Sequence, residues 1–136
     1  MSKLGIDIGS TTVKLVVLDD ENKVQYSRYE RHMSNVFEKV EELIKDMYQE
    51  LGDISLRPVI TGSGGLSLAK LIDVRFEQEV ISCSRAVEAL IPETDVASEL
   101  GGEDAKSTFY GATVEHWRIP KYKVPGSTAA SPMFAV

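Results

Sequence analysis

A short hydrophobic strand that runs into a turn of small residues occurs three times in this sequence, and this pattern constrains the fold most. The three turns read DIGSTT at 7–12, TGSGG at 61–65 and ELGGED at 99–104. Glycine lets the backbone adopt positive φ and lets its amides approach a ligand without a Cβ atom in the way. Strand ends that carry such turns are typical of an α/β protein that binds its ligand at the edge of a sheet.

The first 31 residues predict a meander of three antiparallel strands. Leu4–Ile8 and Val13–Leu18 are short apolar runs with β-branched residues, separated by the small residues 9–12. Residues 19–22 form a polar turn, after which Lys23–Arg31 alternates between apolar and polar positions.

An amphipathic helix is predicted next, because apolar residues recur at helical spacing from Val36 to Leu51. Ser34 is the expected N-cap, and Gly52 is the expected end. The following strand, Arg57–Thr61, should lie beside the first strand, with this helix crossing over between them. The later expected elements are helices at 66–72 and 79–90, a strand at 95–100 and a hairpin from 106 to 118. This order predicts an α/β fold with a mixed sheet and flanking helices.

The residues within the turns suit a nucleotide phosphate. The hydroxyl groups of Ser10, Thr11 and Thr12 add donors for phosphate oxygens, and the carboxylates of Asp7 and Asp104 suit a Mg²⁺ ion that keeps most of its waters. A single strand followed by Gly-Ser is more often only a hairpin, and the spacings match neither the Walker loop nor the dinucleotide fingerprint. The order of the turns along the chain is what favours phosphate binding. The turns at 9–12 and 101–104 are expected to end strands of one sheet and to converge, with the carboxylates of Asp7 and Asp104 facing one cleft.

Composition narrows the choice of partners. The 136 residues carry a net charge of −6, which argues against nucleic acid or an anionic membrane as the main partner. No run approaches the length of a membrane span, and the start shows no secretory pattern, so a cytoplasmic setting is expected.

Few residues offer metal or redox chemistry. Cys83 is the single cysteine, so it forms no internal disulfide and no metal or iron–sulfur site by itself, and it is interpreted as a buried small apolar group. His32 and His116 have no partner at metal-binding spacing and are expected on the surface or on a strand. Lys14 is close to the first turn, where a phosphate contact and a solvated strand lysine remain open alternatives.

Five separated segments agree, in order, with one family. They are LGIDIGSTTVK at 4–14, YERH at 29–32, ITGSGGLSLAK at 60–70, RAVE at 85–88 and ELGGEDAK at 99–106. The first resembles the first phosphate motif of the actin, sugar-kinase and heat-shock chaperone superfamily. Together they resemble the N-terminal activase module of acyl-CoA dehydratase activators, the proteins that serve 2-hydroxyacyl-CoA dehydratases and benzoyl-CoA reductase-type enzymes. The resemblance covers residues 3–119.

This resemblance implies an actin-like, ribonuclease H-like ATPase fold, with an N-terminal lobe over 1–119 and an irregular tail over 120–136. It implies binding of ATP or ADP with Mg²⁺, and a 4Fe-4S cluster bridged between two subunits, hence a homodimer. It also implies ATP hydrolysis coupled to electron delivery to a partner 2-hydroxyacyl-CoA dehydratase.

The resemblance also assigns site residues in three groups. Those expected to contact phosphate and Mg²⁺ are Asp7, Gly9, Ser10, Thr11 and Thr12. Those expected to form the second phosphate turn, with the two acids as catalytic residues and Asp104 also as a metal ligand, are Gly101, Gly102, Glu103 and Asp104. Those expected to line the edge of the cleft are Gly62, Ser63, Gly64 and Gly65.

The sequence departs from the family pattern in three places. Glu99 stands where many activators have Asp, and Ile119–Val124 replaces a segment that supplies a cluster cysteine. The second cluster cysteine and the adenosine motif belong to a C-terminal lobe that this sequence does not contain. The ligands of the cluster are therefore absent, and a truncated or frame-shifted reading of a longer gene is expected.

Two classes of function follow. The first is the N-terminal half of an ATP-dependent activator; the second is a truncated, non-catalytic actin-like fold or binding module. A sugar-kinase or pantothenate-kinase reading shares the first turn but is not supported by ELGGEDAK at 99–106. Because one lobe leaves a nucleotide half solvated, this chain alone is expected to hydrolyse ATP very slowly or not at all.

Overall fold

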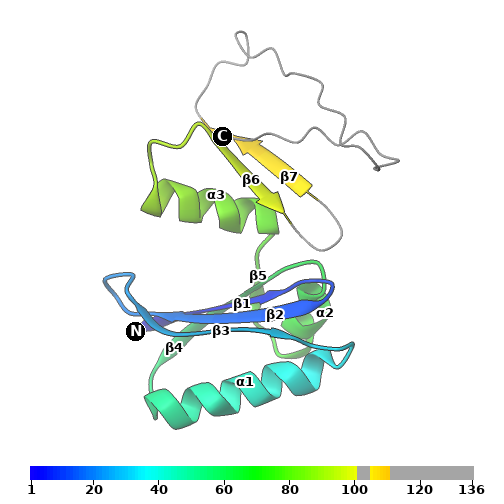
Figure 1. Cartoon of the computed structure of the whole chain (residues 1–136). Helices are drawn as coiled ribbons and strands as arrows, with labels where there is room; N and C mark the ends of the chain where they lie inside the picture. Colours follow the sequence, from blue (N-terminus) through cyan, green and yellow to red (C-terminus); the bar gives the residue numbers. More distant parts are fainter. Residues whose placement is uncertain (101–104, 111–136) are drawn as a thin grey trace. The chain divides into compact units, whose positions relative to one another are not determined.

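The computed structural model of the chain describes residues 1–100 and 105–110, and it divides into two compact units. The first unit is Met1–Ser82, and the second begins at Cys83. The elements of the first unit, labelled in Figure 1, are β1 (Ser2–Ile8), β2 (Thr12–Leu18), β3 (Val24–Arg31), α1 (Val36–Leu51), β4 (Leu56–Thr61), α2 (Gly65–Leu71) and β5 (Arg75–Phe76).

A five-stranded mixed sheet, in the order β3-β2-β1-β4-β5, forms the centre of the first unit. The pairs β1/β2 and β2/β3 are antiparallel, which confirms the predicted meander. The pair β1/β4 is parallel, which confirms that the strand after α1 returns beside the first strand. The two-residue strand β5, parallel to β4, was not predicted, because two residues are too short to show a strand pattern.

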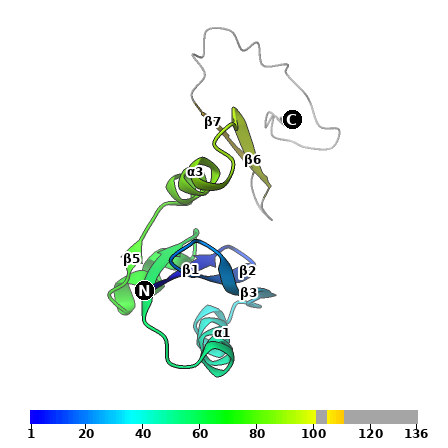
Figure 2. The same ribbon diagram turned by 90° about the vertical axis from the view of Figure 1, so that its left-hand side faces the viewer.

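The core of the first unit lies on one face of this sheet. Leu4, Ile6 and Ile8 of β1 are buried opposite their register partners Val17, Leu15 and Val13 of β2. The helices add to the same buried cluster with Val40, Leu43 and Met47 from α1 and with Leu68 and Ala69 from α2. Figure 1 shows α1 running along the sheet on this side, and Figure 2 views the same helix nearly end-on. Because side chains alternate along a strand, the residues between these ones, among them Asp7 and Lys14, lie on the opposite face of the sheet.

Helix α1 spans the predicted residues, but its N-cap lies one residue later than predicted. The N-cap is Asn35, whose carbonyl accepts the Lys39 N–H at 3.0 Å, and not Ser34. Met33 and Ser34 both adopt positive φ, +48° and +67°, so Ser34 lies in the turn before the helix. The expected end at Gly52 is confirmed, because Gly52 has φ +73° and donates its N–H to the Tyr48 carbonyl at 2.8 Å.

The second unit contains most of α3 (Glu79–Leu90), followed by β6 (Val96–Leu100) and β7 (Ala105–Phe109). Strands β6 and β7 pair antiparallel in a sheet of their own, with Leu100 opposite Ala105. The expectation that the first and third glycine turns end strands of one sheet is therefore wrong, because β6 pairs with β7 and not with the five-stranded sheet. The strand predicted at 112–118, the tail at 120–136 and the boundary at 119 lie outside the described residues.

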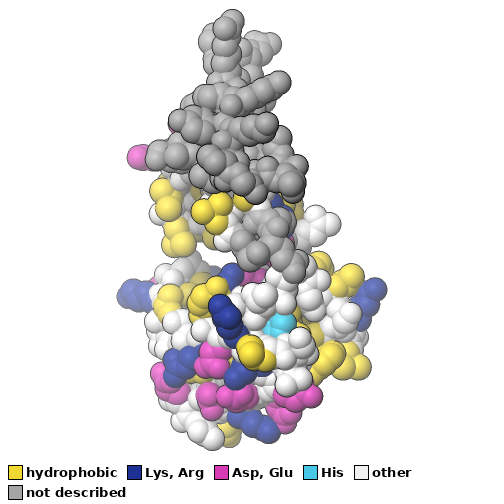
Figure 3. Space-filling model, turned by 45° about the vertical axis from the view of Figure 1, so that its right-hand side comes forward, with side chains coloured by type: hydrophobic (Ala, Val, Ile, Leu, Met, Phe, Trp, Pro, Cys, Tyr) yellow, Lys and Arg dark blue, Asp and Glu magenta, His cyan; other side chains and the backbone are white. Residues whose placement is uncertain are grey.

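Charged side chains of both signs lie interspersed on the surface of the first unit (Figure 3). Many of them pair, as in Lys39 with Glu30 and Glu42, and Lys45 with Glu41. The Lys45–Glu41 pair is exposed on both sides, and exposed pairs contribute little stability, about 0–1 kcal/mol each. Among residues 1–100 and 105–110, no helix is both long enough and apolar enough to cross a membrane.

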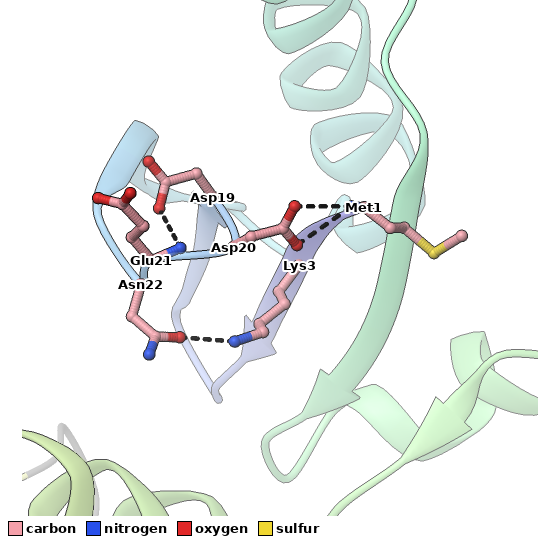
Figure 4. A network of polar contacts seen from close by, with 6 residues as sticks. All are labelled: Met1, Lys3, Asp19, Asp20, Glu21 and Asn22. Atoms are coloured by element: carbon pink, nitrogen blue, oxygen red, sulfur yellow. Dashed lines mark hydrogen bonds and ion pairs between the residues drawn. The ribbon is translucent and has the colours of Figure 1, made fainter.

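The turn between β2 and β3 is closed by Asp19. Its Oδ1 accepts the backbone N–H groups of Glu21 and Lys23, both at 2.9 Å, and its Oδ2 accepts Gln25 Nε2 at 2.9 Å. Figure 4 shows the bond to Glu21 together with two contacts that tie this turn to the start of the chain. The hydrogen bond from the Lys23 backbone, followed by those from Glu21 and Gln25, lowers the pKa of Asp19, although desolvation opposes them.

We expect Asp19 to make folding stability depend on pH in the acid range. A carboxyl whose folded pKa is lowered contributes stability that is present above its unfolded pKa, about 3.9, and is lost as pH falls through the folded value. Between neutral pH and about pH 3, the urea unfolding midpoint should therefore fall more in the wild type than in Asp19→Asn. Asp20→Asn is the matched control, because Asp20 pairs only with the exposed N-terminus at 3.0 Å among the described residues. If the midpoint falls equally in the wild type and in Asp19→Asn, Asp19 does not cause the loss of stability in acid.

Candidate functional site

A row of polar side chains crosses the face of the sheet opposite the core, near the carboxyl ends of β1 and β4. The strand register places Tyr29 opposite Lys14, Lys14 opposite Asp7, and Asp7 opposite Thr61. Lys14 Nζ lies 2.9 Å from Asp7 Oδ2 and 5.4 Å from the centre of the Tyr29 ring. Side chains opposite each other on paired strands are neighbours, so the register itself produces this row. Lys14 is 48% exposed in this pair, so it is a partly solvated strand lysine, and its contact with a phosphate stays a prediction.

One oxygen of Asp7 is buried without a partner. Asp7 Oδ2 pairs with Lys14, but Oδ1 makes no hydrogen bond to any of the residues that the structure describes. A buried carboxylate oxygen that lacks a donor is unfavourable, by about 1–3 kcal/mol or more for a charged group. A bound group that donates a hydrogen bond to this oxygen would remove that cost. Asp7 is therefore the residue in this row best prepared to receive a ligand.

The turn after β4 lies directly against this aspartate. Gly62 has φ +96°, and a Cβ atom on it would lie 2.3 Å from the Ile8 carbonyl oxygen and 2.6 Å from Asp7 Oδ1. Gly64 donates its N–H to the same Ile8 carbonyl at 2.9 Å. Only glycine allows such an approach. The structure thus brings the turn at 62–65 against the end of β1, at the carboxyl ends of two parallel strands.

The turn between β1 and β2 uses one of its amides internally. Gly9 donates its N–H to the Thr12 carbonyl at 2.9 Å, so this amide is engaged within the turn. Ser10 and Thr11 are exposed, and their amides donate to none of the described residues. Among the residues expected to contact phosphate here, Ser10 and Thr11 present both amides and hydroxyls, whereas Gly9 shapes the turn.

His32 is the residue of this region that the sequence reasoning missed. It was expected on the surface or on a strand, but it follows the end of β3 and is 7% exposed. Its Nε2 lies 3.1 Å from the Gly9 carbonyl, and its Nδ1 accepts the Ser34 N–H at 3.1 Å. The expectation is wrong because two backbone groups satisfy both ring nitrogens and allow burial. The sequence did carry one signal for this contact. His32 directly follows β3, and β3 pairs with β2, which begins at the first glycine turn.

The predicted third turn cannot be placed beside the other two. Gly101, Gly102, Glu103 and Asp104 all lie outside the described residues, so their catalytic, phosphate and metal roles remain predictions. Within 1–100 and 105–110, no three His, Cys, Asp or Glu side chains are grouped so that they could hold a metal ion. Mg²⁺ in nucleotide sites is commonly held by one or two carboxylates and by the phosphates themselves. The unpartnered Oδ1 of Asp7 fits that mode, since a water on Mg²⁺ could donate to it.

The residues present do not fit a 4Fe-4S cluster. Cys83 is the single cysteine of the sequence, and it is half-buried where full burial was expected. Desolvation by burial, followed by the charge of Glu99, raises the pKa of the Cys83 thiol, which opposes the thiolate form that ligates iron. Two copies of the chain would supply only two thiols.

Similar solved structures exist. The activator of the 2-hydroxyisocaproyl-CoA dehydratase from Clostridium difficile with bound ADPNP superposes with a TM-score of 0.64 and 25% identity, over 80% of this chain and 41% of that chain. The component A of (R)-2-hydroxyglutaryl-CoA dehydratase from Acidaminococcus fermentans gives a TM-score of 0.65 and 20% identity, over 80% and 42%. The Ppx/GppA phosphatase from Aquifex aeolicus gives a TM-score of 0.50 and 17% identity, over 80% of this chain and 48% of that chain.

No protein-family model matches the chain, and no curated protein matches it significantly. The chain spans about two fifths of the length of the two activators, as their covered shares of 41% and 42% state. The predicted fold class is confirmed: the five-stranded mixed sheet and its helices are those of an actin-like, ribonuclease H-like ATPase fold. The resemblance to the acyl-CoA dehydratase activators that the five sequence segments indicate is likewise confirmed, since two such activators are among its structural neighbours over most of its length.

Proposed function

We propose that this chain binds the Mg²⁺ complex of ATP or ADP as part of an acyl-CoA dehydratase activator. The observation that carries the proposal is the unpartnered Asp7 Oδ1 between two glycine turns at the ends of β1 and β4. Open α/β sheets bind their ligands at the carboxyl ends of strands. The activator with bound ADPNP, at 25% identity, supports a nucleotide as that ligand.

Each part of the site has a role in this proposal. The amides and hydroxyls of Ser10 and Thr11, with the hydroxyl of Thr12, bind phosphate oxygens at the first turn, and Asp7 Oδ1 accepts a hydrogen bond from water on the metal. Ser63, in the turn held against β1 by Gly62 and Gly64, borders the same site. When bound, Mg²⁺ neutralises charge that develops on the phosphates during transfer.

The finer function is also part of the proposal. Gly101 and Gly102 form a second phosphate turn, and Glu103 and Asp104 supply the acids that activate water and hold the metal. ATP hydrolysis then drives delivery of an electron to a partner 2-hydroxyacyl-CoA dehydratase. Because this chain's residues do not fit the 4Fe-4S cluster, the electron carrier must be provided by residues other than these. A homodimer is the expected form, by the same resemblance.

Removing the charge of Asp7 tests the proposal. In calorimetric titrations of the full chain with ADP, the wild type should bind in the presence of Mg²⁺ and bind less tightly with a chelator. Asp7→Asn keeps the shape of the side chain but removes its charge, so affinity for Mg-ADP should fall by about 10-fold to 100-fold. Asp20→Asn, an exposed aspartate at the other end of the hairpin strands, should bind as the wild type does.

Two results would contradict the proposal. One is a wild-type chain, folded by circular dichroism, that releases no binding heat with Mg-ADP at millimolar concentration. The other is an Asp7→Asn variant whose affinity equals that of Asp20→Asn, because the buried carboxylate oxygen would then have no part in the site.

A further inference from the structure

His32 connects the first glycine turn to the segment that starts α1. Its backbone N–H donates to the Thr11 carbonyl at 3.1 Å, which extends the β2/β3 ladder by one step past the Thr12–Arg31 pair. Its ring nitrogen Nε2 lies 3.1 Å from the Gly9 carbonyl. One residue therefore contacts the backbone of the turn at both of its sides.

The other ring nitrogen identifies the tautomer. The Ser34 N–H can only donate, so Nδ1 must accept, at 3.1 Å. A neutral imidazole that accepts at Nδ1 carries its proton on Nε2. The Nε2–H group therefore donates to the Gly9 carbonyl. The alternative tautomer would place an N–H against another N–H and a lone pair against a carbonyl oxygen.

The segment on the far side of the ring is strained. Met33 and Ser34 are consecutive non-glycine residues with φ of +48° and +67°, a conformation that is unfavourable for residues with a side chain. The His32 ring holds the Ser34 N–H, and the His32 carbonyl accepts the Asn35 N–H at 2.7 Å, just before α1 begins. Such backbone conformations persist when surrounding contacts maintain them.

We propose that His32, as its Nε2–H tautomer, is the positioning residue that holds the Gly9–Thr12 turn in its phosphate-binding shape. The proposal rests on the nucleotide function proposed above, and it adds a residue that contacts no ligand. With the Gly9 N–H bound to the Thr12 carbonyl and the Gly9 carbonyl bound to His32, both polar groups of Gly9 are held. The amides of Ser10 and Thr11 then keep a fixed direction, which lowers the ordering cost of binding.

Two conservative variants separate the two ring contacts. Glutamine places an amide N–H near the position of Nε2 and so keeps a donor for the Gly9 carbonyl. Asparagine places a carbonyl oxygen near the position of Nδ1 and so keeps an acceptor for the Ser34 N–H. His32→Leu removes both contacts and serves as the reference for complete loss.

The first readout needs no nucleotide. Proton-coupled ¹⁵N NMR of the histidine rings at pH 8 should show the His32 proton on Nε2. Amide hydrogen exchange should show that the Gly9 N–H, which reports closure of the turn, exchanges about tenfold faster in His32→Asn and His32→Leu but close to the wild-type rate in His32→Gln. The Leu15 amide in the core serves as the reference for global unfolding.

The second readout is affinity for Mg-ADP measured beside urea stability. His32→Gln should bind within about threefold of the wild type, and His32→Asn should bind about tenfold more weakly, even if both are destabilised equally. A purely structural role predicts instead that affinity follows stability in all three variants. A proton on Nδ1, or equal Gly9 exchange in the glutamine and asparagine variants, would overturn the proposal.

The experiment also separates this proposal from the nucleotide function. If the wild type binds no Mg-ADP while the tautomer and the exchange pattern are as expected, the nucleotide function fails and His32 still holds the turn. If Mg-ADP binds and the exchange pattern is absent, the nucleotide function stands and the positioning role fails.

Discussion

Gly62→Ala should lower the free energy of unfolding by about 2–5 kcal/mol. A Cβ atom at this position would lie 2.3 Å from the Ile8 carbonyl oxygen and 2.6 Å from Asp7 Oδ1, well inside van der Waals contact. The first neighbour is backbone of the central strand β1, which cannot yield cheaply. Overpacking typically costs about 1–3 kcal/mol, and φ of +96° adds about 1–2 kcal/mol for a residue with a side chain. Urea unfolding of the full chain, followed by circular dichroism, measures the change.

Gly52→Ala is the matched control for this substitution. Gly52 also has positive φ, +73°, but a Cβ atom there would meet nothing within 4 Å. Its substitution should therefore cost only the backbone term, about 1 kcal/mol. The difference between the two variants isolates the close approach of the Gly62 turn to Asp7. Equal losses at the two positions would mean that the turn does not lie against β1 as described.

Leu43→Ala should destabilise the chain by about 2–5 kcal/mol. Leu43 is fully buried on the face of α1 that packs on the sheet, in one cluster with Leu15 and Val17. Replacing it removes buried apolar surface and leaves a cavity that neighbours on a sheet and a helix can fill only in part. The unfolding midpoint in urea should fall with little change in the slope.

Phe37→Ala on the same helix is the control for this prediction. Phe37 is 51% exposed, so its truncation removes a smaller share of buried contact than truncation of the fully buried Leu43. The free energy of unfolding should therefore fall by about 1 kcal/mol or less in Phe37→Ala. A loss at Phe37 as large as that at Leu43 would mean that α1 packs on the sheet through a different face.

The Asp7 site was partly accessible from sequence. The turns after β1 and β4 were identified by their glycines, and the parallel return of β4 beside β1 followed from the crossover helix between them. Their contact at Gly62 is a consequence of those two facts. The unpartnered Oδ1 was not accessible, because it depends on the Gly62 turn packing over the carboxylate.

The N-cap of α1 and the partner of β6 show where the local sequence pattern was insufficient. The N-cap of α1 moved from Ser34 to Asn35 because His32, buried beneath the first turn, holds Ser34 in the left-handed region. The strand β6 was found by its composition, but its partner was not, since a strand's pattern does not say which other strand it pairs with. In the structure it pairs with β7 and not with the five-stranded sheet.

By itself, the sequence determined the features that depend on local periodicity. Alternation of apolar residues produced the meander, the 3.6-residue period produced α1 with its end at Gly52, and small residues marked the turns. Tertiary structure alone decided which groups meet: Asp7 with Lys14 and Gly62, and the His32 ring with Gly9 and Ser34. The reason is physical. Secondary structure follows from neighbours a few residues apart, whereas burial and hydrogen-bond partners depend on contacts between segments that are distant along the chain.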